Sequence, residues 1–229
     1  MEIAFRGVEN LLKDFEKKLF DLIRDTLELG QNHPAVLVKI IQIVEREEKL
    51  DEILKAKLIN QKLDPFDDIN RKSFRRYKEL FFHYLRDSIS NRFEKCFSKC
   101  SDIAEILKEA QMLLDDLTVV LDEIVPCFPD RYKIFDFFFK EYHIRFNTQM
   151  LSYANNPELV KAKDIIDLVR WVRQEYEPQL GRLGISDPQP PLIETLEPLY
   201  QAYKEHIRVQ SQYFQAMFYY FTETWTRVG

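Results

Sequence analysis

Glycine is scarce in this sequence, and its scarcity excludes several kinds of active site. The chain of 229 residues has five glycines, Gly7, Gly30, Gly181, Gly184 and Gly229. None of them forms a G-x-x-x-x-G-K-S/T loop, a G-x-G-x-x-G turn or a G-x-S-x-G elbow. Those are the backbone platforms that cradle phosphates or present a nucleophile. We therefore predict that the protein is not an enzyme and needs no cofactor.

Long apolar runs, paired cysteines and an excess of positive charge are also missing. No apolar run approaches the ~20 residues that span a bilayer, and the first residues lack the pattern of a secretory signal. The cysteines Cys96, Cys100 and Cys127 include no C-x-x-C pair, so we expect reduced thiols, buried or inert, in the cytosol. A net charge of −5 argues against binding nucleic acid through its phosphates and favours protein partners.

The histidines and cysteines lack the spacing of a metal site. A di-metal helical bundle uses Glu-x-x-His pairs, and none of the four histidines has an acidic residue three positions before it. Cys96 and Cys100 lie one helical turn apart, but a structural zinc site needs four ligands, so packing is the favoured interpretation. Acidic pairs such as Asp115–Asp116 are most simply explained as solvated helix faces. We predict no catalytic residue and no metal ligand.

Helical periodicity runs along nearly the whole sequence. Apolar residues recur every three or four positions, which stacks them on one face of a helix. The expected helices cover residues 8–29, 34–64, 67–96, 103–124, 130–154, 157–176 and 198 onward. Prolines mark the boundaries at Pro34, Pro126 and Pro129, because proline suits a first helical turn and lacks the amide needed further in. Residues 178–191, rich in proline and glycine, are expected to form a loop.

The length and order of these helices predict the fold class. Long helices in succession predict an all-α fold, an elongated rod of stacked antiparallel helical bundles. The break between Pro126 and Pro129 predicts a helical bundle at residues 1–125 and a second bundle at 130–229. The last helix has an apolar face with nothing left in the sequence to cover it, so we expect the second bundle to be truncated. Its apolar stripe consists of Ile207, Phe214, Phe218, Phe221 and Trp225.

One group of basic residues is a candidate binding site. The five cations, with no acidic residue between them, are Arg71, Lys72, Arg75, Arg76 and Lys78. On the expected helix 67–96, Arg71, Arg75 and Lys78 share a face, with Phe74 and Tyr77 interleaved. Such a face could meet anionic lipid or an acidic SNARE helix. A solvated polar face is the commoner explanation, and Glu79 follows the group directly.

Three stretches together resemble the exocyst component 3 family, the sixth of the secretory-class tethering subunits. They are IIQIVEREEKLDEIL (40–54), LLDDLTVVLDEIVPCFPDRYKIFDFFFKEYH (113–143) and DIIDLVRWVRQEY (164–176), followed by TLEPLYQAY (195–203). The resemblance spans roughly 36–207 and is strongest at Arg46–Lys49, at the turn Cys127–Pro129 and at Trp171. It departs from the family at Asp130, where a second proline is usual, and it is weak over residues 67–96.

The resemblance implies a non-catalytic role. It implies the tethering-complex helical-rod fold and, with it, a structural subunit that docks secretory vesicles at the plasma membrane before SNARE-mediated fusion. Its partners would be other exocyst subunits and SNARE proteins, with peripheral contact to anionic membrane and a cytoplasmic location at sites of exocytosis. Phe128, Pro129, Tyr132 and Trp171 match the family as packing residues. The alternative is a related rod acting outside the exocyst, of the tumour-necrosis-factor-α-induced protein 2 type or a MUN-like SNARE regulator.

Overall fold

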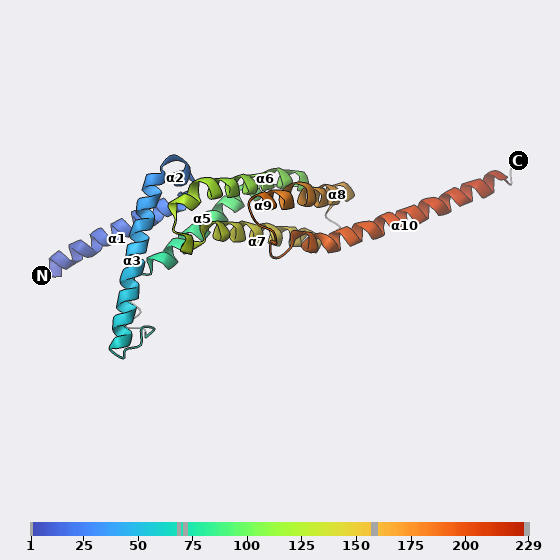
Figure 1. Cartoon of the computed structure of the whole chain (residues 1–229). Helices are drawn as coiled ribbons and strands as arrows, with labels where there is room; N and C mark the ends of the chain where they lie inside the picture. The colour runs from blue at the N-terminus through green and yellow to red at the C-terminus, as the bar shows by residue number, and fades with distance from the viewer. Residues whose placement is uncertain (1, 68–69, 71–72, 157–159, 227–229) are drawn as a thin grey trace. The chain divides into compact units, whose positions relative to one another are not determined.

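The computed structural model describes residues 2–67, 70, 73–156 and 160–226 (Figure 1). Every regular element in these residues is helical and none is a strand, so the predicted all-α fold is confirmed. The α-helices are α1 (Glu2–Arg24), α2 (Thr26–Asn32), α3 (Pro34–Asn60), α5 (Tyr77–Phe97), α6 (Ile103–Val119), α7 (Ile134–Ala154), α8 (Ala162–Trp171), α9 (Glu177–Arg182) and α10 (Leu192–Thr226). Short π- and 3₁₀-helical turns follow α6 and α8.

Contacts within the chain group its residues into two compact units. Unit 1 comprises residues 1–99 and 115–142, and unit 2 comprises residues 100–114 and 143–229. The boundary therefore falls inside α6 and inside α7. The expected bundles at 1–125 and 130–229 stay a prediction, because compactness does not test which segments fold on their own. The rod arrangement also stays a prediction.

In unit 1 the core is built around α5, which contacts both α1 and α3. The buried residues of α5 recur every four positions and so form one continuous stripe: Tyr77, Phe81, Leu85, Ile89, Phe93 and Phe97. Phe20 of α1 packs edge-on against Tyr77 at a centroid distance of 5.5 Å and stacks on Tyr84 at 4.8 Å. These aromatic contacts fix α1 against α5.

In unit 2 the core contains an aromatic cluster formed by α7, α8 and the π-helical turn Val172–Tyr176. Phe146 meets Trp171 edge-on at 5.7 Å, and Trp171 stacks on Tyr176 at 5.3 Å. α10 joins this unit through Leu192, Leu196 and Leu199, which are fully buried, and through contacts with α8. Trp171 thus packs as the family resemblance implied, although its side chain is only partly buried.

Two of the proline boundaries lie where the sequence predicts them. α3 begins at Pro34. The chain then changes from α6 to α7 through a π-helical turn at Val120–Ile124 and two 3₁₀ turns, Val125–Cys127 and Asp130–Tyr132. Phe128 and Tyr132, which flank this break, are 8% and 4% exposed, so their packing holds the break in place.

Several expected boundaries are wrong. The first helix is interrupted at Asp25, where Thr26 donates its hydroxyl to the carbonyl of Ile23 at 2.6 Å. Helix α9 occupies the start of the expected loop at 178–191, because Pro178 fits its first turn. The last helix starts at Leu192 and continues through Pro198, because the burial of its leucines outweighs the cost of one missing amide.

Gly30 lies where α2 packs closest to the π-helical turn of unit 1. A Cβ at this position would overlap the Cδ1 atom of Ile124, whose side chain is fully buried. We expect Gly30→Ala to lower the free energy of unfolding by about 1–2 kcal/mol, because overpacking outweighs alanine's higher helix propensity. Urea denaturation measures the change.

A second substitution tests whether that overlap is the cause. Ile124→Val removes the Cδ1 atom but keeps Cγ1, 3.2 Å from the Cβ position, so Gly30→Ala should cost clearly less in the Ile124→Val background. Gly181→Ala is the matched control, because a Cβ there meets no atom within 4 Å. If Gly30→Ala is as harmless as Gly181→Ala in the wild-type background, the described packing is wrong.

Candidate partner-binding surface

The predicted basic site does not lie on one helical face. Arg71 and Lys72 lie outside the described residues, so only the last three cations of the site can be placed. Helix α5 begins at Tyr77, and the described residues just before it, Ser73 to Arg76, are not helical. Arg75 and Arg76 therefore precede the helix, and only Lys78 lies on it. The expected helix over residues 67–96 is wrong as one continuous element, because residues 73–76 interrupt it.

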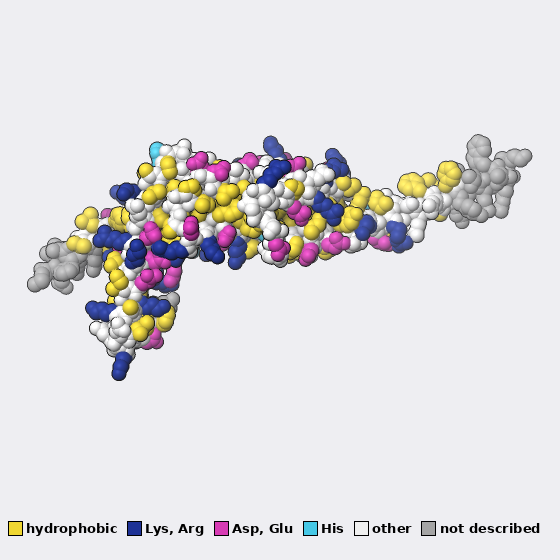
Figure 2. Space-filling view, in the orientation of Figure 1, with side chains coloured by type: hydrophobic (Ala, Val, Ile, Leu, Met, Phe, Trp, Pro, Cys, Tyr) yellow, Lys and Arg dark blue, Asp and Glu magenta, His cyan; other side chains and the backbone are white. Residues whose placement is uncertain are grey.

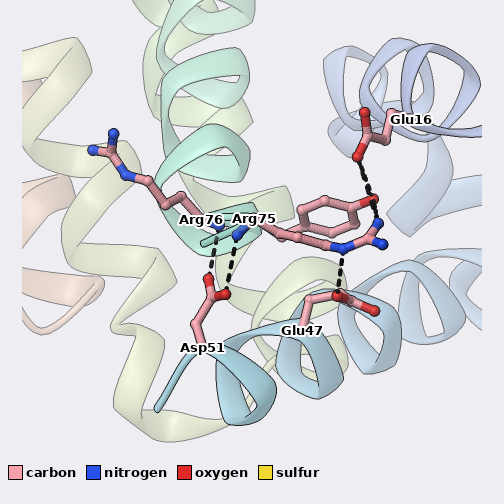
Figure 3. Close-up of polar contacts among 6 residues, drawn as sticks. Glu16, Glu47, Asp51, Arg75 and Arg76 are labelled. Carbon is pink, nitrogen blue, oxygen red and sulfur yellow. Dashed lines mark hydrogen bonds and ion pairs between the residues drawn. The ribbon is translucent and has the colours of Figure 1, made fainter. Parts of the chain in front are cut away.

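A carboxylate distant in sequence explains where α5 starts. Asp51, on α3, accepts hydrogen bonds from the backbone amides of Arg75 and Arg76 at 3.0 and 2.7 Å (Figure 3). Arg76 adopts a left-handed conformation, with φ of 57°, which ends the irregular segment at the first residue of α5. Asp51 thus anchors to α3 the two residues that precede α5, although no side chain of the N-cap residue Arg76 caps the first turn of the helix.

Removing this anchor should loosen the segment that leads into α5. We expect Asp51→Ala to lower the free energy of unfolding by about 1–2 kcal/mol, because two amides lose a charged acceptor. Amide hydrogen exchange at Arg75 and Arg76 should accelerate more than exchange in the middle of α5. Glu52→Ala is the control, since Glu52 forms no ion pair among the described residues. Equal effects of the two substitutions would rule out the anchoring role of Asp51.

Arg75 joins three helices of unit 1. Its guanidinium lies 3.4 Å from Glu47 on α3 and 3.7 Å from Glu16 on α1, as Figure 3 shows. The hydroxyl of Tyr77 donates to Glu16 at 2.9 Å. Burial, and then this hydrogen bond, raise the pKa of Tyr77 to about 12, so the phenol stays protonated and keeps donating. Arg75 is therefore a structural residue of the α1–α3–α5 junction.

Lys78 belongs to a second junction, centred on Glu48 of α3. Glu48 accepts from Lys78 at 2.5 Å, from Arg131 at 2.9 Å and from the hydroxyl of Tyr132 at 3.0 Å. Burial alone would raise the pKa of Glu48, but these hydrogen bonds outweigh it and hold the pKa below its ordinary value. The carboxylate thereby ties α3 to α5 and to the 3₁₀ turn at Asp130–Tyr132.

The described cations of the basic group thus have carboxylate partners inside the molecule. Arg76 also has one, Glu79, on the next turn. A cation that already faces a carboxylate gains less from an added anion, because the new contact competes with the old one. The anion-binding role of Arg71, Lys72, Arg75, Arg76 and Lys78 stays a prediction, and it depends most on Arg76 and on the two residues outside the described part.

An exposed apolar surface lies next to these junctions. Leu50 and Ile53 on α3 belong to an apolar stripe that the sequence would assign to a core, yet they are 49% and 65% exposed. Ile59, Leu63 and Phe66 extend the surface, and Phe66 is 72% exposed. Figure 2 shows acidic and basic side chains gathered over the middle of α3, with hydrophobic side chains beyond them. Sequence periodicity alone does not distinguish a stripe that packs internally from one that faces solvent.

Two other helices expose apolar side chains. On α10, the described side chains from Lys204 to Phe218 are all exposed, including Ile207, Phe214 and Phe218 of the predicted stripe (Figure 2). The side chains of Phe221 and Trp225 lie outside the described residues. On α1, Val8, Leu11, Phe15 and Leu22 share a face and are exposed. Large exposed apolar patches mark sites of contact with other proteins or segments.

The described residues contain neither a metal site nor a membrane-spanning helix. Among the residues that the structure describes, no group of three His, Cys, Asp or Glu side chains is placed to hold a metal ion. Within the same residues no helix is both long enough and apolar enough to cross a membrane. Cys96, Cys100 and Cys127 form no disulfide with one another and are partly buried. Burial, and then Glu123, raise the pKa of Cys127, which lowers its reactivity.

The described part of the chain is an all-α protein with salt-bridged helix junctions and exposed apolar helix faces. Comparison with known families identifies the family to which it belongs. The family model of exocyst complex component Sec6 matches residues 5–220, and the chain belongs to that family. The resemblance inferred from residues 40–54, 113–143 and 164–176 is thereby confirmed. No solved structure matches the chain.

Curated relatives agree with the family match. Exocyst complex component 3 of Drosophila melanogaster is 31% identical over 185 residues, covering 75% of this chain and 23% of the relative. The Caenorhabditis elegans protein of the same name is 25% identical over 74% of the chain and 22% of the relative. Exocyst complex component 3-like protein of Danio rerio is 26% identical over 89% of the chain and 27% of the relative. The chain thus spans about a quarter of the length of the curated relatives it matches.

Proposed function

We propose that this protein is a structural subunit of the exocyst and helps to dock secretory vesicles at the plasma membrane before SNARE-mediated fusion. The observation that carries the proposal is the family match across residues 5–220. In this role the protein acts by protein–protein contact, without a catalytic step or a cofactor. It works in the cytoplasm and peripherally at plasma-membrane sites of exocytosis.

The exposed apolar surfaces support a binding role. Isolated apolar residues are common on any protein surface, but sets that share one helical face are typical of interaction sites. The faces on α1, α3 and α10 are of that kind. We propose other exocyst subunits and SNARE proteins as the partners of such faces.

Affinity purification of the tagged, natural full-length protein from its own cells tests the proposal. Mass spectrometry at moderate salt should recover the other exocyst subunits in amounts comparable with the bait. Recovery of SNARE proteins or lipid-remodelling factors without exocyst subunits would contradict it. The family membership and the helical fold would stand in either case.

A second candidate is a related protein acting outside the exocyst, through SNARE proteins or lipid. One relative, from Danio rerio, is named an exocyst complex component 3-like protein and aligns with 89% of the chain. The lipid version requires cations that are available to a membrane. Arg71, Lys72 and Arg76 are the cations of the basic group to test, because Arg75 and Lys78 hold helix junctions together.

Vesicle binding tests the lipid version of the second candidate. If lipid is the target, replacing Arg71, Lys72 and Arg76 with glutamine should weaken co-sedimentation with phosphatidylserine vesicles, by about 1 kcal/mol for each cation at the surface. The matched control replaces three exposed lysines far from the group in sequence, Lys39, Lys108 and Lys163. Binding that is unchanged by the first set would remove the basis for a lipid role.

A further inference from the structure

A cavity of about 470 Å³ opens in unit 1 beside the α3–α5 junctions. Its apolar wall is formed by Pro65, Phe66 and Phe74, which belong to the segment between α3 and α5. Pro65 is buried and Phe74 partly buried, whereas Phe66 is 72% exposed. A cavity of this size accommodates one or two side chains of a bound peptide, and the aromatic rings give it a flat surface on which a planar group can stack.

The cavity already holds one cation against an aromatic ring. The ammonium of Lys55 lies 5.2 Å from the centroid of Phe66, within the distance of a cation–π contact. Lys55 itself is exposed and forms no ion pair among the described residues. The ring of Phe66 is therefore oriented to bind a positive charge, and its present occupant is held by that contact alone.

The charged lining of the same cavity carries a small excess of negative charge. It consists of four carboxylates and three cations: Glu48, Asp51, Glu52 and Glu79, with Lys55, Arg76 and Lys78. Lys78 pairs with Glu48, and Arg76 pairs with Glu79. Glu79, and more weakly Asp51, raise the pKa of Arg76, while the two oxygens of Asp51 accept backbone amides. Glu52 is exposed and forms no ion pair in the part of the chain that the structure describes, so the cavity combines an aromatic wall with an available carboxylate.

We propose that this cavity binds an arginine side chain presented by a segment of a partner protein. A guanidinium stacks on an aromatic face and at the same time donates to a carboxylate in its plane, so arginine fits both features. Its aliphatic stem would cover Pro65 and Phe74. The inference states which chemical group one surface of the proposed exocyst subunit binds. It rests on the proposed function only for the biological identity of the partner.

Titration of the protein with N-acetyl-arginine amide, followed by ¹H–¹⁵N NMR, tests the proposal without any knowledge of the partner. Shifts are expected at residues 51–55 and 73–79, with millimolar affinity because the probe is a single residue. N-acetyl-citrulline amide is the matched control, since it has the same shape without the charge. Equal binding of citrulline, shifts confined to other regions, or no shifts at millimolar concentrations would overturn the proposal.

Variants at exposed positions make the test specific. Phe66→Ala should weaken arginine binding about five-fold, and Glu52→Gln by a similar factor, since each removes one contact with the guanidinium. Lys55→Gln should strengthen binding, because it removes the cation that now occupies the ring. Phe214→Ala on α10, also exposed, should change nothing. Binding unaffected by both Phe66→Ala and Glu52→Gln would overturn the proposal, whatever the role of the protein in the exocyst.

Discussion

Replacing Asp116 with alanine is expected to lower the free energy of unfolding by about 3 kcal/mol, because it removes the acceptor at the centre of a buried polar group. The guanidinium of Arg92 donates to both oxygens of Asp116 at 2.6 and 2.7 Å, and the hydroxyl of Tyr142 donates at 2.7 Å. Asp116 is 7% exposed and Tyr142 1%. Burial, and then the charge of Asp116, raise the pKa of Tyr142, so its hydroxyl remains a donor.

The loss of stability in Asp116→Ala arises mainly at Tyr142. Arg92 has nearly half of its side chain in solvent and can turn toward water, whereas the tyrosine hydroxyl would stay buried without an acceptor. Asp116→Asn keeps an acceptor oxygen and should cost about half as much. Urea denaturation measures both variants, and Asp122→Ala, at an exposed carboxylate of the same unit, is the control. If Asp116→Ala costs no more than Asp122→Ala, the buried group does not stabilise the unit.

The second large effect is expected at His143 in unit 2. Its Nε2 lies 2.7 Å from the carbonyl of Pro190, and its Nδ1 lies 2.7 Å from the hydroxyl of Tyr176. A carbonyl can only accept, so Nε2 carries a proton. Because burial lowers the pKa of His143, the ring is neutral and its Nδ1 accepts from the tyrosine. His143→Ala removes both contacts at a site that is 1% exposed. We expect a loss of about 2–4 kcal/mol.

The same geometry predicts a pH dependence. Burial lowers the pKa of His143 below its ordinary value of 6.5, so the unfolded chain takes up this proton at a higher pH than the folded protein does. The contribution of neutral His143 to the free energy of unfolding is therefore complete above about pH 6.5. It decreases as the pH falls toward the pKa of His143 in the folded protein, by up to ~1.4 kcal/mol per pH unit. Denaturation between about pH 7 and pH 5 should show a steeper loss in wild type than in His143→Gln. Parallel pH profiles would contradict the neutral assignment.

The sequence predicted helices wherever the determining interactions are local. Periodic apolar residues identified all the long helices, and Pro34 and Pro129 marked changes of direction because proline restricts its own backbone. The Cys127–Tyr132 turn and Trp171 also carried the family resemblance. Those features depend on residues close together in sequence, which is why they could be predicted.

The errors come from interactions between distant residues. The start of α5 depends on Asp51, more than twenty positions before Arg75, and no local signal reveals that contact. Pro198 was expected to begin a helix, but tertiary burial of Leu192 and Leu196 extends α10 in front of it. The cavity beside Phe66 was missed because its aromatic and acidic residues come together only after α3 and α5 have packed. Exposure of Leu50 and Ile53 was missed for the same reason.

The measurement that tests the central claim most directly is the native sedimentation of the full-length protein in lysate from its own cells, before and after depletion of another exocyst subunit. A structural exocyst subunit should sediment with the intact complex and move to slower fractions once the complex is disrupted. If the protein sediments apart from the other exocyst subunits in undepleted cells, and depletion leaves its position unchanged, the proposed role in the exocyst is contradicted.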